Sequence, residues 1–527
     1  MASRRNELSA YTFSRRRTVA AFLQPSGGGN EEDVPKPRRA FMPSLIVGAV
    51  AVAGFGAYGM IKPSAPLNWD KANAVIVDKQ TTTRYVMLGG QLHPVLNIAS
   101  ARLLLGVDST VEEVDDSVLN SGSVPHGATL GIPYAPDSLP TAQDAGAPKT
   151  WAECDRPASG GQTGTDQKLF VLGGADAAKV AAAGAARTGG KLNTRQALYV
   201  QAPSGLYLVD STGTAHQLVS TGDQSSDSAT DPSSQAAQLL ATAAFGGNVG
   251  LPQAVTKEWL ATLRPGDPIS LPEAAMDGFG DPAQTIGGVH FNVGDLFQET
   301  DNSGQVLHYV VLKDGIHRVS DFTDRLIVAL HADKSPEPKM DPLAAVGANN
   351  KPPFTPGQDW PQGLVSQANT GGPSVACSVY TGATGQTGAP VQALWTGTDY
   401  PIDSTSGSAG VYVTPGAGLL YRAVSGTSTD SGAVNLLTDT GLRYPVQMNA
   451  DSTAPPSAAA TAGDGDGAGS ADAPSADASG AAQPNTTAAL LGYKSVNPLP
   501  AVPESWSSLL PAGPSLNSAA ATQQQGS

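Results

Sequence analysis

The stretch RRAFMPSLIVGAVAVAGFGAYGMIK (residues 38–62) is the longest uncharged apolar run of this chain. It holds 22 uncharged residues between Arg39 and Lys62. At a rise of about 1.5 Å per residue, a helix of this length covers the roughly 30 Å hydrocarbon core of a bilayer. The sequence therefore predicts one membrane-spanning helix over residues 40–61.

Two other interpretations of this run stay open. A cleavable secretion signal has an apolar stretch of roughly 7–15 residues close to the N-terminus and a small-residue cleavage site. Here 39 residues precede a longer run, although Ala57-Tyr58-Gly59 resembles such a site. A buried helix of a soluble domain would need comparably apolar helices to pack on, and the rest of the sequence shows none. We therefore expect the segment to be a retained anchor.

Charge predicts the orientation of this anchor. Residues 1–39 hold eight basic and four acidic side chains, and basic segments stay on the cytoplasmic side of a membrane. We expect residues 1–39 to be cytoplasmic and the part that starts at residue 62 to lie outside. The net charge is −15 for the whole chain and +4 for residues 1–39, so the remainder carries −19. This acidity argues against binding of nucleic acid by the exterior part.

The N-terminal segment offers a candidate contact face. Read as a helix, it places five apolar side chains near one side: Leu8, Tyr11, Val19, Phe22 and Leu23. We expect Leu8 and Phe22 to pack on the cytoplasmic part of a partner. The alternative is that the neighbouring arginines only set the topology and meet anionic lipid.

The predicted span carries small residues at helical spacing. Ala49, Ala53 and Ala57 recur every four residues, with Gly56 and Gly59 nearby. Small side chains let a second membrane helix approach closely. We therefore expect this stripe to be a packing face within the membrane.

Four later stretches have the pattern of β-hairpins, in which two apolar runs flank a turn rich in Gly, Asp, Ser or Thr. They are RYVMLGGQLHPV (84–95), GLYLVDSTGTAHQLV (205–219), HYVVLKDGIHRV (308–319) and AVNLLTDTGLRYPV (433–446). Their spacing of roughly one hundred residues predicts one repeated small module. ALWTGTDYPI (393–402) is a candidate fifth, diverged copy.

A basic side chain recurs in the second run of each hairpin: His93, His216, His317 and Arg443. A metal or acid–base site would need ligands at matching spacing, and the fourth copy has Arg with no shared Cys, Asp or Glu nearby. We interpret these residues as structural and expect no metal.

Motifs for common enzymatic chemistry are absent from the sequence. GAARTGGKLN (184–193) comes nearest to a phosphate loop, but Ala185 stands where the first Gly belongs and Leu192 follows Lys191. G-x-S-x-G and H-E-x-x-H do not occur. The sequence therefore leans against an enzyme, and we expect neither catalytic residues nor a cofactor.

The two cysteines, Cys154 and Cys377, are too few for a disulfide scaffold and lack metal-site spacing. In an oxidising exterior compartment a disulfide between the two is favoured, and two separate buried thiols are the alternative.

The part of the chain after the anchor divides by composition. We assign residues 62–450 to the exterior modules. We expect residues 451–486 to form a disordered Ala/Ser/Gly/Asp linker, because this stretch lacks large apolar side chains. We assign residues 487–527 to the end of the last module and a frayed tail.

Several of these segments together resemble the EccB family, a membrane component of the type VII (ESX) secretion system. The likeness rests on SRRNELSAYTFSRRRTVAAFL near the N-terminus, the single anchor, TRYVMLGGQLHPVLNIASARLLLG, GATLGIPYAPDSLP (127–140), the two cysteines and LLPAGPSL near the end. The segments follow one another in the family's order.

The resemblance implies a single-pass inner-membrane protein with an elongated, β-rich α+β exterior portion in the periplasm. Small repeat modules would surround a central domain with pseudo-twofold symmetry, and Cys154 would pair with Cys377. The implied role is that of a structural core subunit that supports protein export with EccC, EccD and EccE homologues. The alternatives are an exterior protein that binds cell-wall glycan, or a subunit that hydrolyses ATP.

Overall fold

The computed structural model describes residues 3–23, 37–61, 65–71, 73–106, 109–158, 164–181, 189–219, 234–331, 338–339, 351–370, 374–384, 390–402, 410–426, 431–447 and 486–525. Nearly all of the predicted linker over residues 451–486 lies outside these ranges. The chain divides into two compact units. One comprises Met1–Ala72, Val77–Thr82 and Glu112–Ser123, and the other comprises Asn73–Ile76, Thr83–Val111 and Val124–Ser527.

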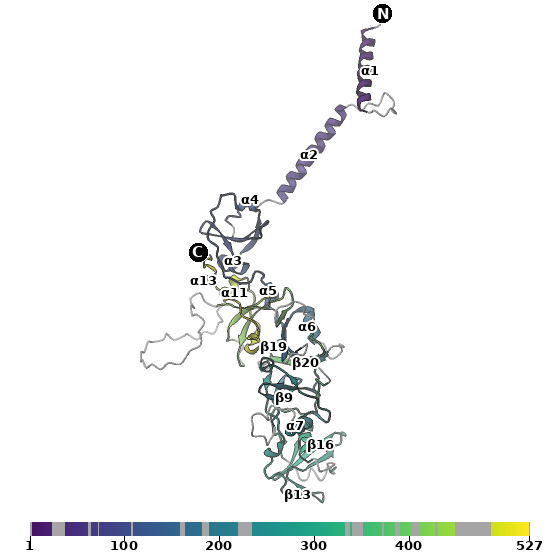
Figure 1. Ribbon diagram of the computed structural model, residues 1–527, viewed down its shortest axis with the longest axis vertical. Helices are drawn as coiled ribbons and strands as arrows, with labels where there is room; N and C mark the ends of the chain where they lie inside the picture. The colour runs from purple at the N-terminus through teal and green to yellow at the C-terminus, as the bar shows by residue number, and fades with distance from the viewer. Residues whose placement is uncertain are drawn as a thin grey trace, which may run out of the picture. The chain divides into compact units, whose positions relative to one another are not determined.

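The first unit contains the helices α1 (Arg4–Leu23), α2 (Pro37–Ile61) and α4 (Asp116–Leu119). Figure 1 labels all three. α2 contains the predicted span and begins three residues before it, at Pro37. Proline fits the first turn of a helix because the amide that it lacks has no helical partner there. Leu23 is the last residue of α1.

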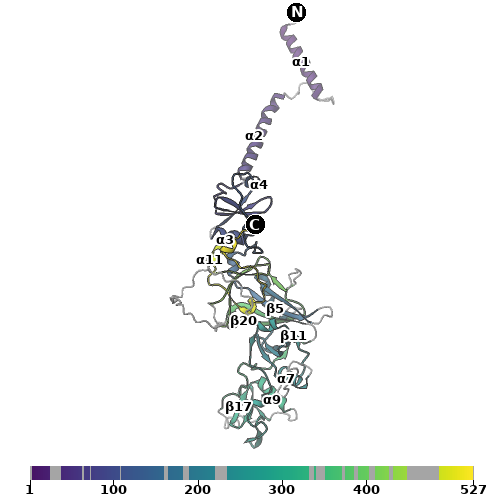
Figure 2. The ribbon, with the colours of Figure 1, turned by 60° about the vertical axis from the view of Figure 1, so that its left-hand side comes forward.

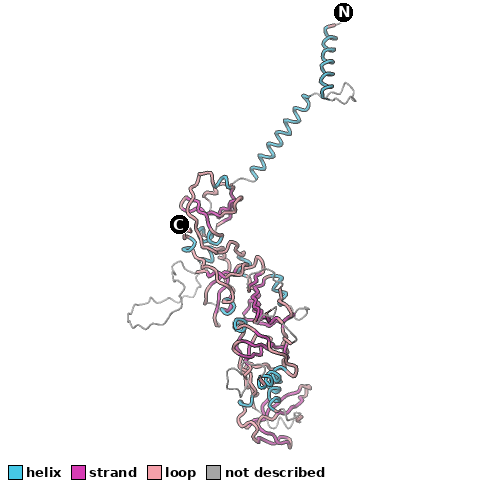
Figure 3. Tube along the Cα trace, in the orientation of Figure 1, coloured by secondary structure: helices cyan, strands magenta, loops and turns pink. Residues whose placement is uncertain are grey.

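Beyond α2 the described chain consists mainly of strands and loops with short helices, as Figure 3 shows. The first sheet has the strand order β3-β2-β1-β4. Its strands are β1 (Ala74–Asp78), β2 (Arg84–Leu88), β3 (Gln91–Val95) and β4 (Thr110–Val114). α3 (Ile98–Leu105) follows β3, and its N-cap Asn97 accepts a hydrogen bond from the Ser100 amide at 2.9 Å.

Two further sheets contain the same order of strands, β10-β9-β8-β11 and β24-β23-β22-β25. The first includes β8 (Gln196–Ala202), β9 (Gly205–Asp210), β10 (Thr214–Gln217), β11 (Gln253–Ala254), β12 (Arg264–Pro265) and β18 (Ser366–Gln367). The second consists of β22 (Leu419–Val424), β23 (Val434–Leu437), β24 (Arg443–Pro445) and β25 (Ala501–Pro503). In each, the fourth strand joins in parallel, β11 to β8 and β25 to β22.

A six-stranded sheet, called the central sheet below, has the order β21-β6-β5-β19-β20-β7. Its strands are β5 (Thr150–Pro157), β6 (Thr165–Leu172), β7 (Gly189–Lys191), β19 (Val375–Thr384), β20 (Pro390–Gly397) and β21 (Val411–Val413). β5 and β19 form its antiparallel middle pair. Two short helices border it in sequence, α5 (Ala142–Gly146) and α6 (Gly174–Ala181).

Between β10 and β18 the described residues form, besides β11 and β12, smaller sheets and helices. The sheets are β13-β14 and β15-β16-β17, with β13 (Pro282–Ile286), β14 (Val289–Asn292), β15 (Leu296–Thr300), β16 (Val306–Leu312) and β17 (Gly315–Val319). The helices are α7 (Gln235–Phe245), α8 (Lys257–Ala261), η1 (Pro272–Ala275) and α9 (Asp321–Leu330). α7 and α9 lie side by side (Figure 2) and share one apolar core.

All four predicted hairpins form antiparallel strand pairs: β2–β3, β9–β10, β16–β17 and β23–β24. The predicted fifth copy over residues 393–402 is wrong. β20 ends at Gly397, and residues 398–402 form bends rather than a second strand. β20 pairs instead with β19 and β7, because its apolar side chains fit the interior of the central sheet.

The frayed tail expected over residues 520–527 (AATQQQGS) is also wrong for residues 520–525. The C-terminal helices are α11 (Thr486–Leu490), α12 (Glu504–Ser507) and α13 (Ser518–Ala521). Ala521 of α13 is fully buried in a core that includes Leu103 of α3. The Gln525 amide then donates to the Thr129 carbonyl at 2.8 Å. Small and polar residues looked disordered in the sequence, yet here an alanine is what fits against α3.

Candidate functional site

The predicted membrane face lies on an uncovered helix. Residues 41–58 of α2 have a mean hydropathy of 1.7, and none of this window is buried. It is the one helix in the described ranges that is long and apolar enough to cross a bilayer. Ala49, Ala53 and Ala57 are all exposed. A Cβ placed on Gly56 would meet no atom within 4 Å, so the small-residue side is open to another helix.

The predicted contact face lies on α1. Leu8 is 64% exposed and Phe22 90% exposed. Tyr11 and Val19 are exposed as well. At 100° per residue, however, Arg15 falls within the same sector of the helix. The face is therefore mixed, apolar and cationic.

The two cysteines meet at the middle of the central sheet. Cys154 of β5 and Cys377 of β19 are paired in register and joined by a disulfide. Both are fully buried in an apolar cluster that includes Phe170 and Trp395. The bond links residues 223 positions apart. Together with the register, it fixes β5 against β19.

The opposite face of the same strand pair carries buried polar side chains. Glu153 and Ser378 stand directly opposite each other and are 1% and 0% exposed. On the outer sides of this pair, Glu153 stands opposite Leu169 of β6, and Ser378 stands opposite Leu394 of β20. Leu169 belongs to the apolar cluster around Trp506, and Leu394 to the cluster around Trp259. The polar pair thus lies between two hydrophobic cores, a position called the seam below.

Asp155 connects this face to α8. Its Oδ2 accepts hydrogen bonds from the Thr256 amide at 2.6 Å and the Thr256 hydroxyl at 2.9 Å. The Thr256 hydroxyl in turn accepts from the Trp259 amide at 3.0 Å and caps α8. Burial raises the pKa of Asp155 to about 6, an effect that the Thr256 bonds reduce. Burial, together with repulsion from Asp155, raises the pKa of Glu153 to about 8.

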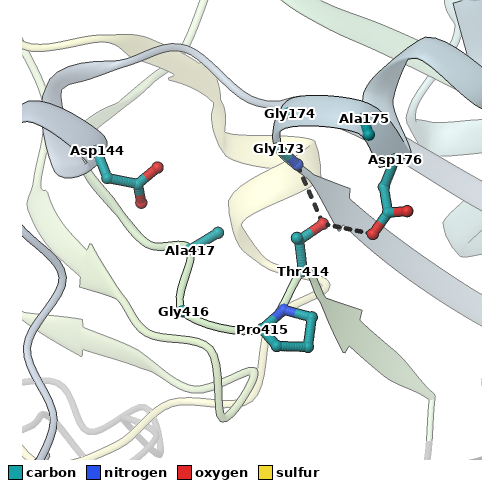
Figure 4. A pocket seen from close by; sticks show the side chains of 9 residues that line it. All are labelled: Asp144, Gly173, Gly174, Ala175, Asp176, Thr414, Pro415, Gly416 and Ala417. Atoms are coloured by element: carbon teal, nitrogen blue, oxygen red, sulfur yellow. Dashed lines mark hydrogen bonds between the residues drawn. The ribbon is translucent and has the colours of Figure 1, made fainter.

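A hollow of about 280 Å³ opens where α5, α6 and the chain after β21 come together (Figure 4). Its rim carries the carboxylates of Asp144 and Asp176. The hydroxyl of Thr414 accepts from the Gly173 amide at 3.1 Å and donates to Asp176 Oδ2 at 3.2 Å. Lys179 binds Asp176 at 2.9 Å and holds the pKa of that carboxyl below its usual range.

Both carboxylate oxygens of Asp144 at this hollow also accept hydrogen bonds. Lys149 Nζ donates to its Oδ1 at 2.9 Å, and the Gly418 amide donates to its Oδ2 at 2.7 Å. Both carboxylates therefore act as structural acceptors.

The recurring basic residues each bind a backbone carbonyl on a later segment. In the three histidines the Nδ1–H group donates to a backbone carbonyl. The pairs are His93 to Ala128 (2.9 Å), His216 to Asp267 (2.9 Å) and His317 to Pro352 (2.8 Å). In the fourth hairpin, Arg443 Nε donates to Leu510 at 3.1 Å. The four lie in four different sheets and form no common site. These contacts favour the structural interpretation.

No cluster of three metal-ligating side chains occurs within the described ranges. The Gly-rich stretch 184–193 is described only in part, because residues 182–188 lie outside the described ranges. Its Gly190 and Lys191 belong to β7, which pairs with β20.

The seam was not predicted from the sequence. The signal was present in WAECDRP, because Glu153 and Asp155 flank Cys154 and alternation places both on the face away from it.

Comparison with known proteins gives a consistent result. The family model described as type VII secretion system ESX-1, transport TM domain B, matches residues 1–527. The ESX-3 secretion system ATPase EccB3 of Mycobacterium tuberculosis is 24% identical over 475 residues, covering 85% of this chain and 82% of the relative. The ESX-5 secretion system ATPase EccB5 of Mycobacterium marinum is 32% identical over 153 residues, which is 29% of each chain.

Solved structures match as well. A chain from an intact ESX-5 inner membrane complex superposes with a TM-score of 0.58 at 19% identity, covering 100% of this chain and 96% of that one. A chain from an EccB3 dimer of the ESX-3 core complex gives a TM-score of 0.58 at 20% identity, covering 85% and 100%. The fold is thus similar to both.

Proposed function

Because the chain belongs to the EccB family of type VII secretion proteins, whose family model matches residues 1–527, we propose that it is a structural core subunit of an inner-membrane ESX complex that supports protein export. This match over the whole chain carries the proposal. The similarity to a chain of an intact ESX-5 inner membrane complex supports it.

The proposed topology is a single pass with residues 1–39 in the cytoplasm and the β-rich portion in the periplasm. The apolar length of α2 and the basic charge before it support this arrangement. EccC, EccD and EccE homologues are the proposed partners. Affinity purification of the tagged full chain from detergent-solubilised membranes tests the assembly. Recovery of other membrane subunits in one large species is expected, and a lone monomer that sediments with cell-wall glycan would contradict the proposal.

The exterior portion is proposed to consist of related modules around the central sheet. Three sheets with the same strand order support this, as do the similar stretches AVTKEWLATLRPG (254–266) and AVPESWSSLLPAG (501–513). Trp259 and Trp506 occupy matching positions in these stretches, and both are fully buried. Their clusters include residues of the central sheet, Leu394 and Leu169 respectively. This arrangement supports pseudo-twofold symmetry about the β5–β19 pair, close to the disulfide.

Two contact faces are part of the proposal. The exposed small residues Ala49, Ala53 and Ala57 of α2 would pack on another membrane helix. Leu8 and Phe22 of α1 would contact the cytoplasmic part of a partner, a role that their exposure allows.

Hydrolysis of ATP is a second candidate function, because the names of the relatives include the word ATPase. Lys191 is the only lysine of the Gly-rich stretch 184–193 and belongs to β7 rather than to a loop that opens a helix, which disfavours a phosphate-loop mechanism. Phosphate release by the purified full chain tests this function. A rate that is unchanged in Lys191→Ala would exclude the stretch as its site.

A further inference from the structure

Glu153 is a carboxyl group placed where an ionised carboxylate has little support. It is 1% exposed, and neither of its oxygens makes a hydrogen bond of good geometry in the described structure. Its register partner Ser378 is 0% exposed, and the Ser378 hydroxyl is likewise without such a bond. The two side chains face each other across the β5–β19 pair, where cross-strand Cβ atoms lie about 5 Å apart. A neutral carboxyl group can donate to a hydroxyl, whereas a bare buried carboxylate is strongly disfavoured.

The groups that face Glu153 supply no positive charge. On its own strand the next residue on this face is Asp155, and repulsion from Asp155 and from Glu258 of α8 raises the pKa of Glu153. Lys257 of α8 is 80% exposed and pairs with Glu258 at 3.7 Å. β6 presents the amide of Gln167, which lowers the pKa of Glu153 and offsets part of the increase from burial and repulsion, and β19 presents the hydroxyl of Ser378. Two acids and two neutral polar groups therefore surround the carboxyl. This arrangement favours its protonated form.

We propose that the protonation state of Glu153 controls the packing at the seam. As the neutral acid, Glu153 lets α8 and the sheet that contains β8–β10 pack on the central sheet, and loss of its proton loosens that packing. The inference does not depend on the proposed secretory role. It concerns a conformational device inside the exterior portion.

The structure indicates where the loosening would occur. The disulfide between Cys154 and Cys377 holds β5 to β19 next to Glu153. A negative charge on Glu153 therefore cannot gain access to water by separation of these two strands. The contact to α8 depends on Asp155, whose hydrogen bonds to Thr256 are made on the same face. Repulsion between two carboxylates would act on this contact. We therefore expect α8, and not the strand pair, to open.

The direction of the pH dependence follows from linkage. A carboxyl group with its pKa raised by folding binds its proton more tightly in the closed state. The closed state is therefore favoured at low pH and weakens as pH rises from the ordinary Glu range to about 8. Asp155 contributes in the same direction, but only up to about pH 6. Between pH 6.5 and 8 the effect belongs to Glu153.

Hydrogen exchange on the full chain in detergent, with the disulfide intact, tests the proposal. After correction for the intrinsic exchange rate, the opening constant of residues 256–263 should rise nearly tenfold per pH unit from pH 6.5, and the slope should fall to about half a proton near pH 8, as expected for one group with a closed-state pKa of about 8. Glu153→Gln should remove this dependence, and Glu113→Gln, at an exposed acid, should leave it unchanged. Equal pH dependence in Glu153→Gln and the unmodified chain would overturn the proposal.

A second measurement needs no folded variant. Infrared difference spectra of the unmodified chain between pH 6.5 and 8.5 should show the loss of a protonated carboxyl band, because few other acids titrate in this range. If no such band is lost, Glu153 does not change its protonation state in this range and the proposal is wrong.

Discussion

Cys154 and Cys377 face each other across the middle strand pair of the central sheet, with their Cα atoms 4.0 Å apart. The bond between them joins two strands that are separated by 223 positions in sequence. The residues between them include β8–β10, β15–β17 and their helices. The strand pair therefore closes a loop that contains a large part of the exterior portion.

Loss of this bond should destabilise the exterior portion. In the loop-entropy model, closing a loop of this length removes roughly 5 kcal/mol of unfolded-state freedom. We expect Cys154→Ser/Cys377→Ser to lower the thermal midpoint and to increase cleavage by added protease, while membrane insertion stays normal. Cys154→Ser alone serves as the control for a free thiol. Alkylation of both cysteines in the unreduced, unmodified chain would contradict the disulfide.

The anchor should remain in the mature protein. Protease added to intact spheroplasts should digest the β-rich portion and spare an N-terminal tag, because the basic residues before α2 keep residues 1–39 inside. Detection of both ends by immunoblotting measures this. A mature chain that begins near residue 60 would show that the segment is cleaved.

The small-residue side of α2 should tolerate no bulk. Ala53→Leu adds a branched side chain where another helix is expected, and a loss of about 1 kcal/mol in packing corresponds to roughly fivefold less intact complex. The chain should stay in the membrane, as fractionation would show. Ala51→Leu, about 160° around α2 from Ala53, is the matched control. Unchanged complex yield in Ala53→Leu would exclude this face.

Polar replacements on α1 should separate assembly from insertion. Leu8→Gln and Phe22→Gln remove exposed apolar groups without altering the arginines that set topology. We expect a lower yield of complex with normal amounts of inserted chain, measured by native gel and immunoblot. If the yield is normal, and replacement of Arg15 instead weakens lipid binding, the lipid interpretation of α1 holds.

The C-terminal segment should stabilise the fold. Deletion of residues 518–527 removes the buried Ala521 and the hydrogen bond from the Gln525 amide to Thr129. The unfolding free energy should fall by about 2 kcal/mol, from one small buried side chain and one or two hydrogen bonds. Deletion of residues 526–527 alone should have no effect. A truncated chain as stable as the full one would show that this contact contributes nothing.

The sequence by itself determined the features that depend on local pattern. The uncharged run gave α2, since length and hydropathy are properties of one continuous segment. The Gly- and Asp-containing turns gave four hairpins, since a tight turn fixes which residues pair. The order of motifs along the whole chain gave the family.

The tertiary structure alone decided which distant segments meet. Residues 393–402 matched a hairpin locally, but packing in the central sheet took β20 as an interior strand. Residues 520–525 looked unstructured because alanine and glutamine bury little surface on their own, and α3 supplies the site that Ala521 fills. The seam has the same origin. The burial that favours the protonated form of Glu153 comes from two hydrophobic cores, which are built by residues far from Glu153 in sequence. A local sequence pattern does not show that these distant residues pack around it.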